Sequence, residues 1–274
     1  MRQILVIGST GKTGKRVYER LVAKGVAVRP ASRNSPIPFD WYRQDTWSAA
    51  LQQIEAVYIT FQPDLAVPAS VGIVANFVEA ARVCGVKKLV LLSGRGEAEA
   101  VACEGIVTAS GLDWTVLRAS FFMQNYSEGF WLDGILSGEF VIPEVRVREP
   151  FVDAEDIADV AAAAVLNREH NGRIYELTGP ELLTFEETIL KISKGLETPV
   201  RFRPIPVNDY AGVLREAGLP QDVIWLITYL FTEVLDGRNE SVKHDIQHVL
   251  GRKAGSFDQY VHRTVRGGLW QKKD

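Results

Sequence analysis

Short apolar runs alternate along the chain with longer segments in which apolar residues recur at helical spacing. The first run, Gln3–Ile7, is continuously apolar after its first residue, which is typical of a strand covered on both faces of a sheet. In the next segment, Val17, Leu21 and Val22 mark one apolar face of a helix. A second strand over residues 26–29 completes the first strand–helix–strand unit.

The same alternation continues towards the C-terminus. It predicts an α/β fold, a Rossmann-type doubly wound parallel sheet with a smaller C-terminal α/β region. We expect the Rossmann domain over residues 1–150 and the C-terminal region, partly interleaved with that sheet, over residues 151–274. Thr184 opens a helix in that region with a capping box. Further strands are expected over 56–61, 88–93, 114–118 and 173–178, and further helices over 68–84, 97–110, 156–166 and 221–235.

Pro30 conflicts with this pattern. The second strand of such a sheet is expected in the interior, hydrogen-bonded on both sides, and proline has no N–H to donate. We therefore expect the second strand to end early or to bulge at Pro30.

A glycine-rich turn connects the first strand to the first helix. Gly8 permits the tight turn, Gly11 lets the backbone approach a pyrophosphate, and Gly14 lets the helix and the strand pack closely. Free N–H groups and the positive end of the helix dipole then bind the phosphates. The position of this turn between a strand and a helix predicts that residues 1–150 bind NAD(P). A P-loop ATPase is excluded, because Val6 occupies the position at which that motif needs a glycine. The candidate residues of this turn are Gly8, Ser9, Thr10, Gly11, Lys12, Thr13 and Gly14.

The end of the second strand indicates which cofactor binds. Sites for NAD place an acidic residue there to bind the ribose hydroxyls, whereas this chain has Ser32 followed by Arg33. A guanidinium pairs with the 2′-phosphate of NADP(H) through two parallel hydrogen bonds. The sequence therefore favours NADP(H), the alternative being that Arg33 is a solvated loop residue.

The carboxyl ends of the later strands supply further candidates, because ligands of doubly wound sheets bind beyond those ends. Thr60, Phe61, Gln62, Ser93 and Gly94 are the expected cofactor contacts. An aromatic-rich segment after the strand at 114–118 either shapes a pocket for a flat apolar substrate or packs in the core or between subunits. Its candidate substrate-binding residues are Phe121, Phe122, Met123, Gln124, Asn125 and Tyr126.

Composition indicates which classes of partner and which cellular compartment to expect for the protein. The chain has 274 residues and a formal net charge of −3, which gives no electrostatic reason to expect nucleic acid or an anionic membrane as a partner. The apolar run at the N-terminus is too short for a signal peptide or a membrane span. Cys84 and Cys103 are expected to be reduced. We expect a cytoplasmic monomer or homodimer that acts on a small-molecule substrate.

Several longer motifs resemble those of a known family. They are Gly8–Gly14, Ala31–Arg33, Phe39–Trp41, Asp45–Trp47, Gly111–Ser120 with Gln124 and Asn125, Phe151–Asp153, Asp156–Ala158 and Leu250–Arg252. Over essentially the whole chain the sequence resembles the NmrA-like branch of the atypical short-chain dehydrogenase/reductases, and within it the ergot-alkaloid-type reductases. The resemblance implies that NADP(H) binds with Asp40 and Trp41 near the adenine and with residues 60–62 along the cofactor. The family contains both reductases and non-catalytic NADP sensors.

The proton relay of ordinary short-chain dehydrogenases is missing. That relay is a Tyr-x-x-x-Lys pair, and none of the eight tyrosines has lysine four positions later. The absence of a dedicated acid favours hydride transfer to an iminium ion or a quinone. The same absence disfavours a nucleotide-sugar epimerase. If an acid is needed, Tyr126 is the first candidate and Asp153 the second. The alternative is a protein that only senses NADP(H).

Other polar residues carry less information. His244 and His248 are four positions apart but lack a third ligand, so we expect no metal. Glu97, Glu99 and Glu104 are expected to form the solvated face of a helix.

Overall fold

The computed structural model describes residues 3–129 and 131–271, which form two compact units. The first unit consists of the chain up to Ala119 together with Ala154–Leu177 and His244–Arg252. The second consists of Ser120–Asp153, Thr178–Lys243 and the chain from Lys253 onward. The chain therefore passes repeatedly between the units, and the boundary expected at residue 150 lies in the second unit, shortly before the chain returns to the first.

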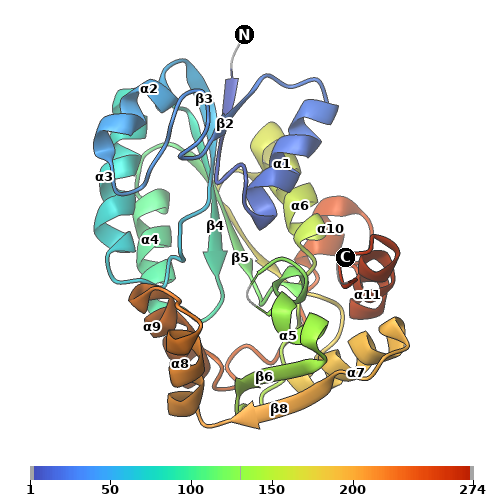
Figure 1. Cartoon of the computed structure of the whole chain (residues 1–274). Helices are drawn as coiled ribbons and strands as arrows, with labels where there is room; N and C mark the ends of the chain where they lie inside the picture. The colour runs from blue at the N-terminus through green and yellow to red at the C-terminus, as the bar shows by residue number, and fades with distance from the viewer. Residues whose placement is uncertain (1–2, 130, 272–274) are drawn as a thin grey trace. The chain divides into compact units, whose positions relative to one another are not determined.

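A six-stranded, entirely parallel sheet forms the centre of the first unit (Figure 1). Helices cover both of its faces, with α2, α3 and α4 on one and α1 and α6 on the other. This is the Rossmann-type doubly wound sheet expected from the sequence. In sheet order the strands are β2 (Val28–Ala31), β1 (Gln3–Ile7), β3 (Ile54–Ile59), β4 (Lys88–Gly94), β5 (Asp113–Ala119) and β7 (Arg173–Leu177). The helices are α1 (Lys12–Ala23), α2 (Trp47–Leu51), α3 (Ser70–Val83), α4 (Ala98–Thr108), α6 (Ala154–Leu166) and α10 (Asp245–Leu250).

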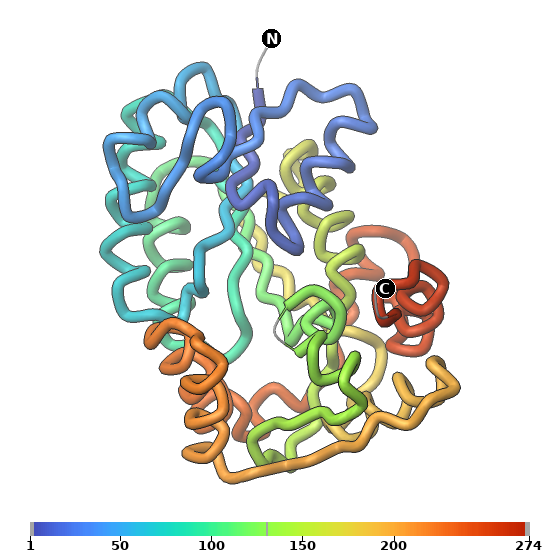
Figure 2. The backbone as a smooth tube through the Cα atoms, in the orientation of Figure 1, coloured from blue at the N-terminus to red at the C-terminus, as the bar shows by residue number. Residues whose placement is uncertain are grey.

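The apolar runs of the sequence became the central strands because both of their faces are covered. Leu5, Val57 and Leu89 are fully buried in neighbouring strands, and burial of each such side chain contributes about 1.5–3 kcal/mol. Of the apolar residues assigned to α1, Val17 and Leu21 are buried, whereas Val22 is largely exposed. A late segment also belongs to this unit, since α10 lies beside α6 (Figure 2).

The strand that contains Pro30 neither ends early nor bulges, so that prediction is wrong. β2 pairs with β1 in an unbroken parallel register in which Pro30 lies opposite Val6. The reason is the strand order, which places β2 at the edge of the sheet rather than in its interior. The carbonyl groups of Ala27 and Ala31 accept hydrogen bonds from the β1 side, so the backbone nitrogen of Pro30 faces the open edge.

The second unit is built on a two-stranded parallel sheet and short helices. Its core is aromatic, with Phe140, Phe151, Phe185 and Phe257 almost fully buried. The capping box expected at Thr184 is present at the start of α7. The elements are the 3-10 turn Met123–Tyr126, α5 (Leu132–Ser137), β6 (Glu139–Pro143), α7 (Phe185–Leu196), β8 (Arg201–Ile205), α8 (Val207–Glu216), α9 (Gln221–Tyr229) with the π-helical turn Leu230–Val234, and α11 (Phe257–Arg266). In the described ranges, every helix is too short or too polar to cross a bilayer.

Candidate functional site

The glycine turn between β1 and α1 is closed so tightly that side chains cannot enter it. Gly8 has a φ of +69°, and a Cβ on it would overlap Thr60 Oγ1. The Gly11 N–H donates to the Gly8 carbonyl oxygen at 2.8 Å. A Cβ on Gly14 would overlap that same carbonyl oxygen. Gly8 and Gly14 therefore have the turn and packing tasks that the sequence predicts, whereas the approach of a pyrophosphate to Gly11 stays a prediction.

The first turn of α1 has no side-chain cap. Gly11 is the N-cap residue and supplies no side-chain hydrogen bond, and the first turn contains no acidic residue. The first amides of a helix have no partner within the helix, and they lie at the positive end of its dipole. The N-terminus of α1 thus lacks a side-chain cap and follows a strand end, and anions commonly bind at helix N-termini of this kind.

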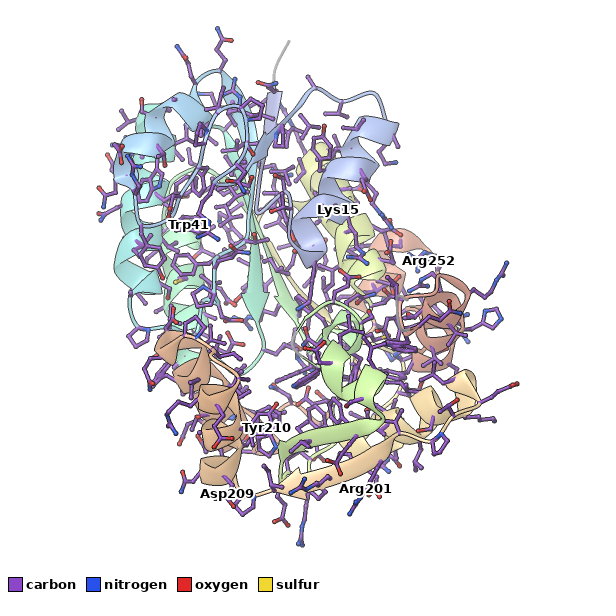
Figure 3. All side chains as sticks on the ribbon, in the orientation of Figure 1. Lys15, Trp41, Arg201, Asp209, Tyr210 and Arg252 are labelled. Carbon is purple, nitrogen blue, oxygen red and sulfur yellow. The ribbon has the colours of Figure 1, made fainter. Side chains whose placement is uncertain are left out.

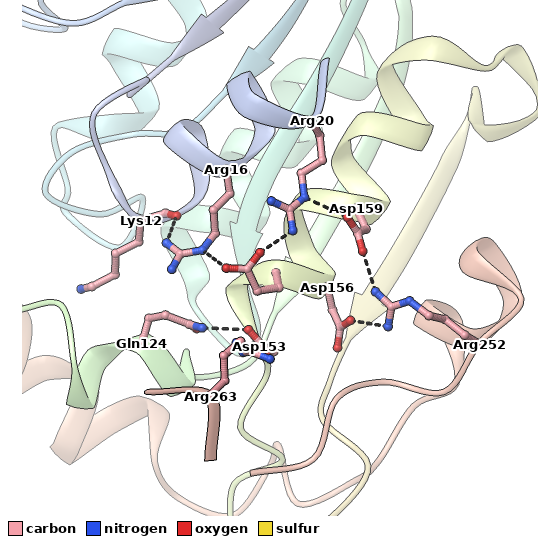
Figure 4. A network of polar contacts seen from close by, with 10 residues as sticks. Lys12, Arg16, Arg20, Gln124, Asp153, Asp156, Asp159, Arg252 and Arg263 are labelled. Atoms are coloured by element: carbon pink, nitrogen blue, oxygen red, sulfur yellow. Dashed lines mark hydrogen bonds and ion pairs between the residues drawn. The ribbon is translucent and has the colours of Figure 1, made fainter. Parts of the chain in front are cut away.

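Ion pairs fasten this end of α1 to α6 (Figure 4). Arg16 donates to the carbonyl oxygen of Lys12 at 2.7 Å and to Glu155 Oε1 at 2.6 Å, and Arg20 pairs with Glu155 as well. Burial alone would raise the pKa of Glu155, but the two guanidinium groups outweigh it and lower that pKa. The candidate phosphate turn therefore starts a helix whose position is fixed by partly buried charge pairs.

The ion pairs continue to the segment after α10. Arg20 Nε is 2.9 Å from Asp159 Oδ1, and Arg252 contacts both Asp156 and Asp159 at 2.6 Å. Arg252 belongs to the late Leu–Gly–Arg motif, so this motif serves to attach α10 to α6 (Figure 4).

The residues expected to determine specificity for NADP(H) over NAD(H) lie at the end of β2. Ser32 is half-buried, and its hydroxyl group lies 2.9 Å from the Ser35 hydroxyl group. Arg33 is exposed, so its guanidinium is accessible to a ligand. The role of Arg33 towards a 2′-phosphate stays a prediction.

Trp41 connects the loop after β2 to the end of β3. Its indole Nε1 donates to the Thr60 carbonyl oxygen at 3.0 Å, and its ring is buried among other aromatic rings, including Phe61 and Phe77 (Figure 3). The Asp40 carboxylate accepts from the neighbouring backbone of Tyr42. The expected contact of Asp40 and Trp41 with adenine stays a prediction, and the indole edge of Trp41 is already bonded within the protein.

The end of β3 lies against the glycine turn. Thr60 Oγ1 donates to the Ile7 carbonyl oxygen at 3.2 Å, and a Cβ on Gly11 would be 3.8 Å from the amide nitrogen of Gln62. Thr60 and Gln62 therefore lie beside the turn, whereas Phe61 is buried. The contact of these residues with a cofactor stays a prediction.

The solvated helix face expected at Glu97, Glu99 and Glu104 is wrong for two of these residues. Glu97 and Glu104 are buried, and Glu99 is half-buried. Glu104 accepts hydrogen bonds from the Ser93 hydroxyl at 2.6 Å and from Arg118 Nε at 2.9 Å. These contacts attach α4 to the ends of β4 and β5, so the Ser93 hydroxyl faces the helix.

No sequence pattern indicates this Glu104–Arg118 pair. The partners are 14 residues apart and lie on a helix and a strand, so no local spacing relates them. The hydrogen bond to Glu104 is the main cause that raises the pKa of Arg118.

Tyr126, the first acid candidate, is wholly buried in the second unit. Its hydroxyl group is 2.8 Å from Thr188 Oγ1, and its ring packs against Phe140 and Trp131. Burial raises the pKa of Tyr126 well above its usual range. A catalytic role for Tyr126 stays a prediction, and these surroundings are typical of a core residue.

Asp153, the second acid candidate, is also buried in the second unit. Its carboxylate accepts from Gln124 Nε2 at 2.7 Å and pairs with Arg263 (Figure 4). Both oxygen atoms of this carboxylate therefore accept hydrogen bonds from side chains of the same unit. The geometry favours a structural role for Asp153 and for Gln124.

The remaining candidates for substrate binding differ in exposure. Phe121, Phe122 and Asn125 are half-buried, whereas Met123 is buried. The Phe121 ring stacks on Trp131 at 6.5 Å between centroids. Their role in substrate binding stays a prediction. In residues 3–129 and 131–271, no three potential metal ligands of the His, Cys, Asp and Glu types come together.

The chain is similar in sequence to several known proteins. A model of the NmrA-like family matches residues 1–260. Prestalk A differentiation protein A of Dictyostelium discoideum is 27% identical over 279 residues, which are 95% of this chain and 92% of that protein. Festuclavine dehydrogenase easG of Aspergillus fumigatus is 28% identical over 285 residues, 95% of this chain and 97% of that protein.

A solved structure has the same fold. The NADPH-dependent quinone oxidoreductase of Escherichia coli in complex with NADPH superposes with a TM-score of 0.77 at 20% identity. The superposition covers 97% of this chain and 100% of that chain.

Proposed function

Because the chain belongs to the NmrA-like family, we propose that it is an NADPH-dependent oxidoreductase that transfers hydride to a small, flat electrophile, an iminium ion or a quinone. The observation that carries the cofactor assignment is the uncapped N-terminus of α1 behind the closed glycine turn. The amides of that turn bind the pyrophosphate, and Arg33 binds the 2′-phosphate.

The names of the relatives support the reductase assignment. One is a festuclavine dehydrogenase, and a protein of the same fold is an NADPH-dependent quinone oxidoreductase. The absence of a Tyr-x-x-x-Lys pair supports the substrate class. Hydride addition turns an iminium ion directly into a neutral amine, so catalysis in that case needs only that the nicotinamide be held against the acceptor.

NADPH oxidation by the purified protein tests the proposal. The acceptors are a panel of quinones and cyclic iminium ions, and NADH is run in parallel. We expect saturable turnover with at least one acceptor class and a clear preference for NADPH. Binding of NADPH without reduction of any acceptor would contradict the reductase assignment.

The assignment of Arg33 predicts a selective effect on affinity. Replacing Arg33 with alanine should weaken NADPH binding about 10–100-fold, because a charge-assisted contact contributes about 1.5–3 kcal/mol. Binding of NADH, which lacks the 2′-phosphate, should change little. Titration of cofactor fluorescence measures both affinities. Arg82→Ala on the exposed surface of α3 is the control, and equal weakening of both cofactors by Arg33→Ala would refute the assignment.

A non-catalytic NADP(H) sensor is the second candidate. It is favoured by the burial of Tyr126 and the pairing of Asp153, which leave both sequence-derived acids without access to a substrate in their own unit. A redox sensor must distinguish NADP⁺ from NADPH. A large difference between the two affinities, together with failure to reduce every acceptor, would favour the sensor.

A further inference from the structure

Two carboxyl groups lie beyond the carboxyl ends of adjacent central strands in the first unit. Asp64 follows β3, and Glu97 follows β4. This is the edge of the sheet at which the glycine turn follows β1, and ligands of doubly wound sheets bind at this edge. The two acids have no counterpart in the relay of ordinary short-chain dehydrogenases.

The Glu97 side chain is buried although one of its oxygen atoms lacks a partner. Only 7% of the residue is exposed, and its carboxyl group lies against Gly94, where a Cβ would overlap it. Glu97 precedes α4 as its N-cap residue, but its side chain makes no capping hydrogen bond. In the described part of the chain Oε2 is buried and has no hydrogen-bond partner. A buried oxygen without a partner costs about 1–3 kcal/mol, so it indicates a function other than packing.

The surroundings of this pair favour a proton on Glu97. The two carboxyl groups lie close enough for the charge of Asp64 to raise the pKa of Glu97. Asp64 accepts the backbone N–H of Ala66 at 2.9 Å, and such a bond stabilises the ionised form. Burial raises the pKa of both groups, and the charge of Asp64 raises that of Glu97 further.

Among the residues that the structure describes, the charges that shift the pKa of Glu97 belong to acids, and these do not neutralise the pair. Glu99 and Glu104 face Glu97 with the same sign of charge. The guanidinium of Arg118 is bonded to Glu104, and Arg95 lies 3.8 Å from Glu176. The surroundings therefore favour a protonated Glu97.

We propose that Glu97 is the proton donor of the reductase, with Asp64 as the half-buried partner through which the proton leaves and returns. This inference rests on the proposed function and adds an acid to it. NADPH transfers a hydride to the acceptor, which forms NADP⁺ and, from a quinone, the hydroquinone monoanion. The Glu97 O–H bond then breaks, its proton forms the second O–H bond of the hydroquinone, and water reprotonates the carboxylate. An iminium ion becomes a neutral amine on hydride addition and takes no proton from Glu97.

The two acceptor classes distinguish a proton donor from a structural residue. Loss of a structural residue lowers turnover with both acceptors, whereas loss of the donor lowers turnover with a quinone alone. In Glu97→Gln the side chain keeps its size and loses its acidic proton. Turnover with a quinone should fall about 100-fold, the lower end of the range for general acids, whereas turnover with a cyclic iminium ion should stay within about twofold. Asp64→Asn, which retains the oxygen that accepts from Ala66, should give the same pattern. Glu79→Gln on the exposed surface of α3 is the control. Equal losses with both acceptors, or none, overturn the proposal.

A second measurement does not depend on turnover. A carboxyl group whose pKa is higher in the folded than in the unfolded state keeps its proton to higher pH in the folded state. The free energy of unfolding therefore falls as pH rises above the ordinary glutamate pKa. The urea midpoint of the wild-type protein should therefore fall more steeply above pH 4.5 than that of Glu97→Gln. Identical pH dependences overturn the protonated pair itself. If the slopes differ but no acceptor is reduced, the pair exists, while the reductase function and the donor role both fail.

Discussion

Replacing Gly14 with alanine should reduce NADPH affinity at least about 100-fold. The added Cβ would overlap the Gly8 carbonyl oxygen and lie 2.6 Å from the Gly8 carbonyl carbon and 3.0 Å from the Ile7 carbonyl oxygen. All three atoms belong to the backbone, so no side chain can rotate away. Either the turn opens or α1 moves from β1, and both changes displace the amides that we assign to the pyrophosphate. The strain should also destabilise the fold by about 1–3 kcal/mol.

Fluorescence titration with NADPH and urea unfolding measure these two effects. Gly72→Ala is the matched control, because a Cβ on this α3 glycine meets no atom within 4 Å. That substitution should leave affinity unchanged and stabilise the protein by about 0.5–1 kcal/mol, since alanine favours a helix more than glycine does. Wild-type affinity in Gly14→Ala would mean that the phosphates bind elsewhere.

Replacing Arg118 with methionine should destabilise the protein by about 3–5 kcal/mol. Glu104 is only 3% exposed, and Arg118 is its charge partner, with a second hydrogen bond of 2.5 Å from Nη2 to Oε2. Removal of one member of a buried pair leaves the other charge uncompensated, which costs far more than the pair itself contributes. The free energy of unfolding in urea at pH 7 measures the loss.

Two comparisons separate this cause from lost packing. Arg82→Met breaks an exposed pair with Glu79 and should cost at most about 1 kcal/mol. Adding Glu104→Leu to Arg118→Met removes the isolated charge and should restore most of the stability. If the double variant is as unstable as the single one, the loss comes from packing and not from charge.

The sequence predicted those parts of the fold that depend on local patterns. Continuous apolar runs identified β1 and β4 because strands covered on both faces need no polar positions. The glycine turn was predictable because Gly8 and Gly14 have backbone tasks that residues with a Cβ cannot perform. The capping box at Thr184 was predictable for the same reason, since both of its hydrogen bonds are local.

The remaining features depend on long-range neighbours, and local patterns do not encode these. The acids of the α4 region have the polarity of a solvated helix face. Only the approach of Arg118 from β5 and of Asp64 from the loop after β3 shows why Glu104 and Glu97 are buried. Strand order is likewise not local, so Pro30 was assigned to the interior. Tyr126 was selected for its chemistry, although its burial depends on a core assembled from distant segments.

The position of Pro30 affects whether molecules of this protein can associate through the edge of the sheet. An open strand edge offers unpaired N–H and C=O groups to which a strand of another molecule can add, a common first step of aggregation. At the outer edge of β2, the N–H that such a strand would need is missing from Pro30. Pro30 therefore removes one of the hydrogen bonds by which the sheet could grow from one molecule into the next at this edge.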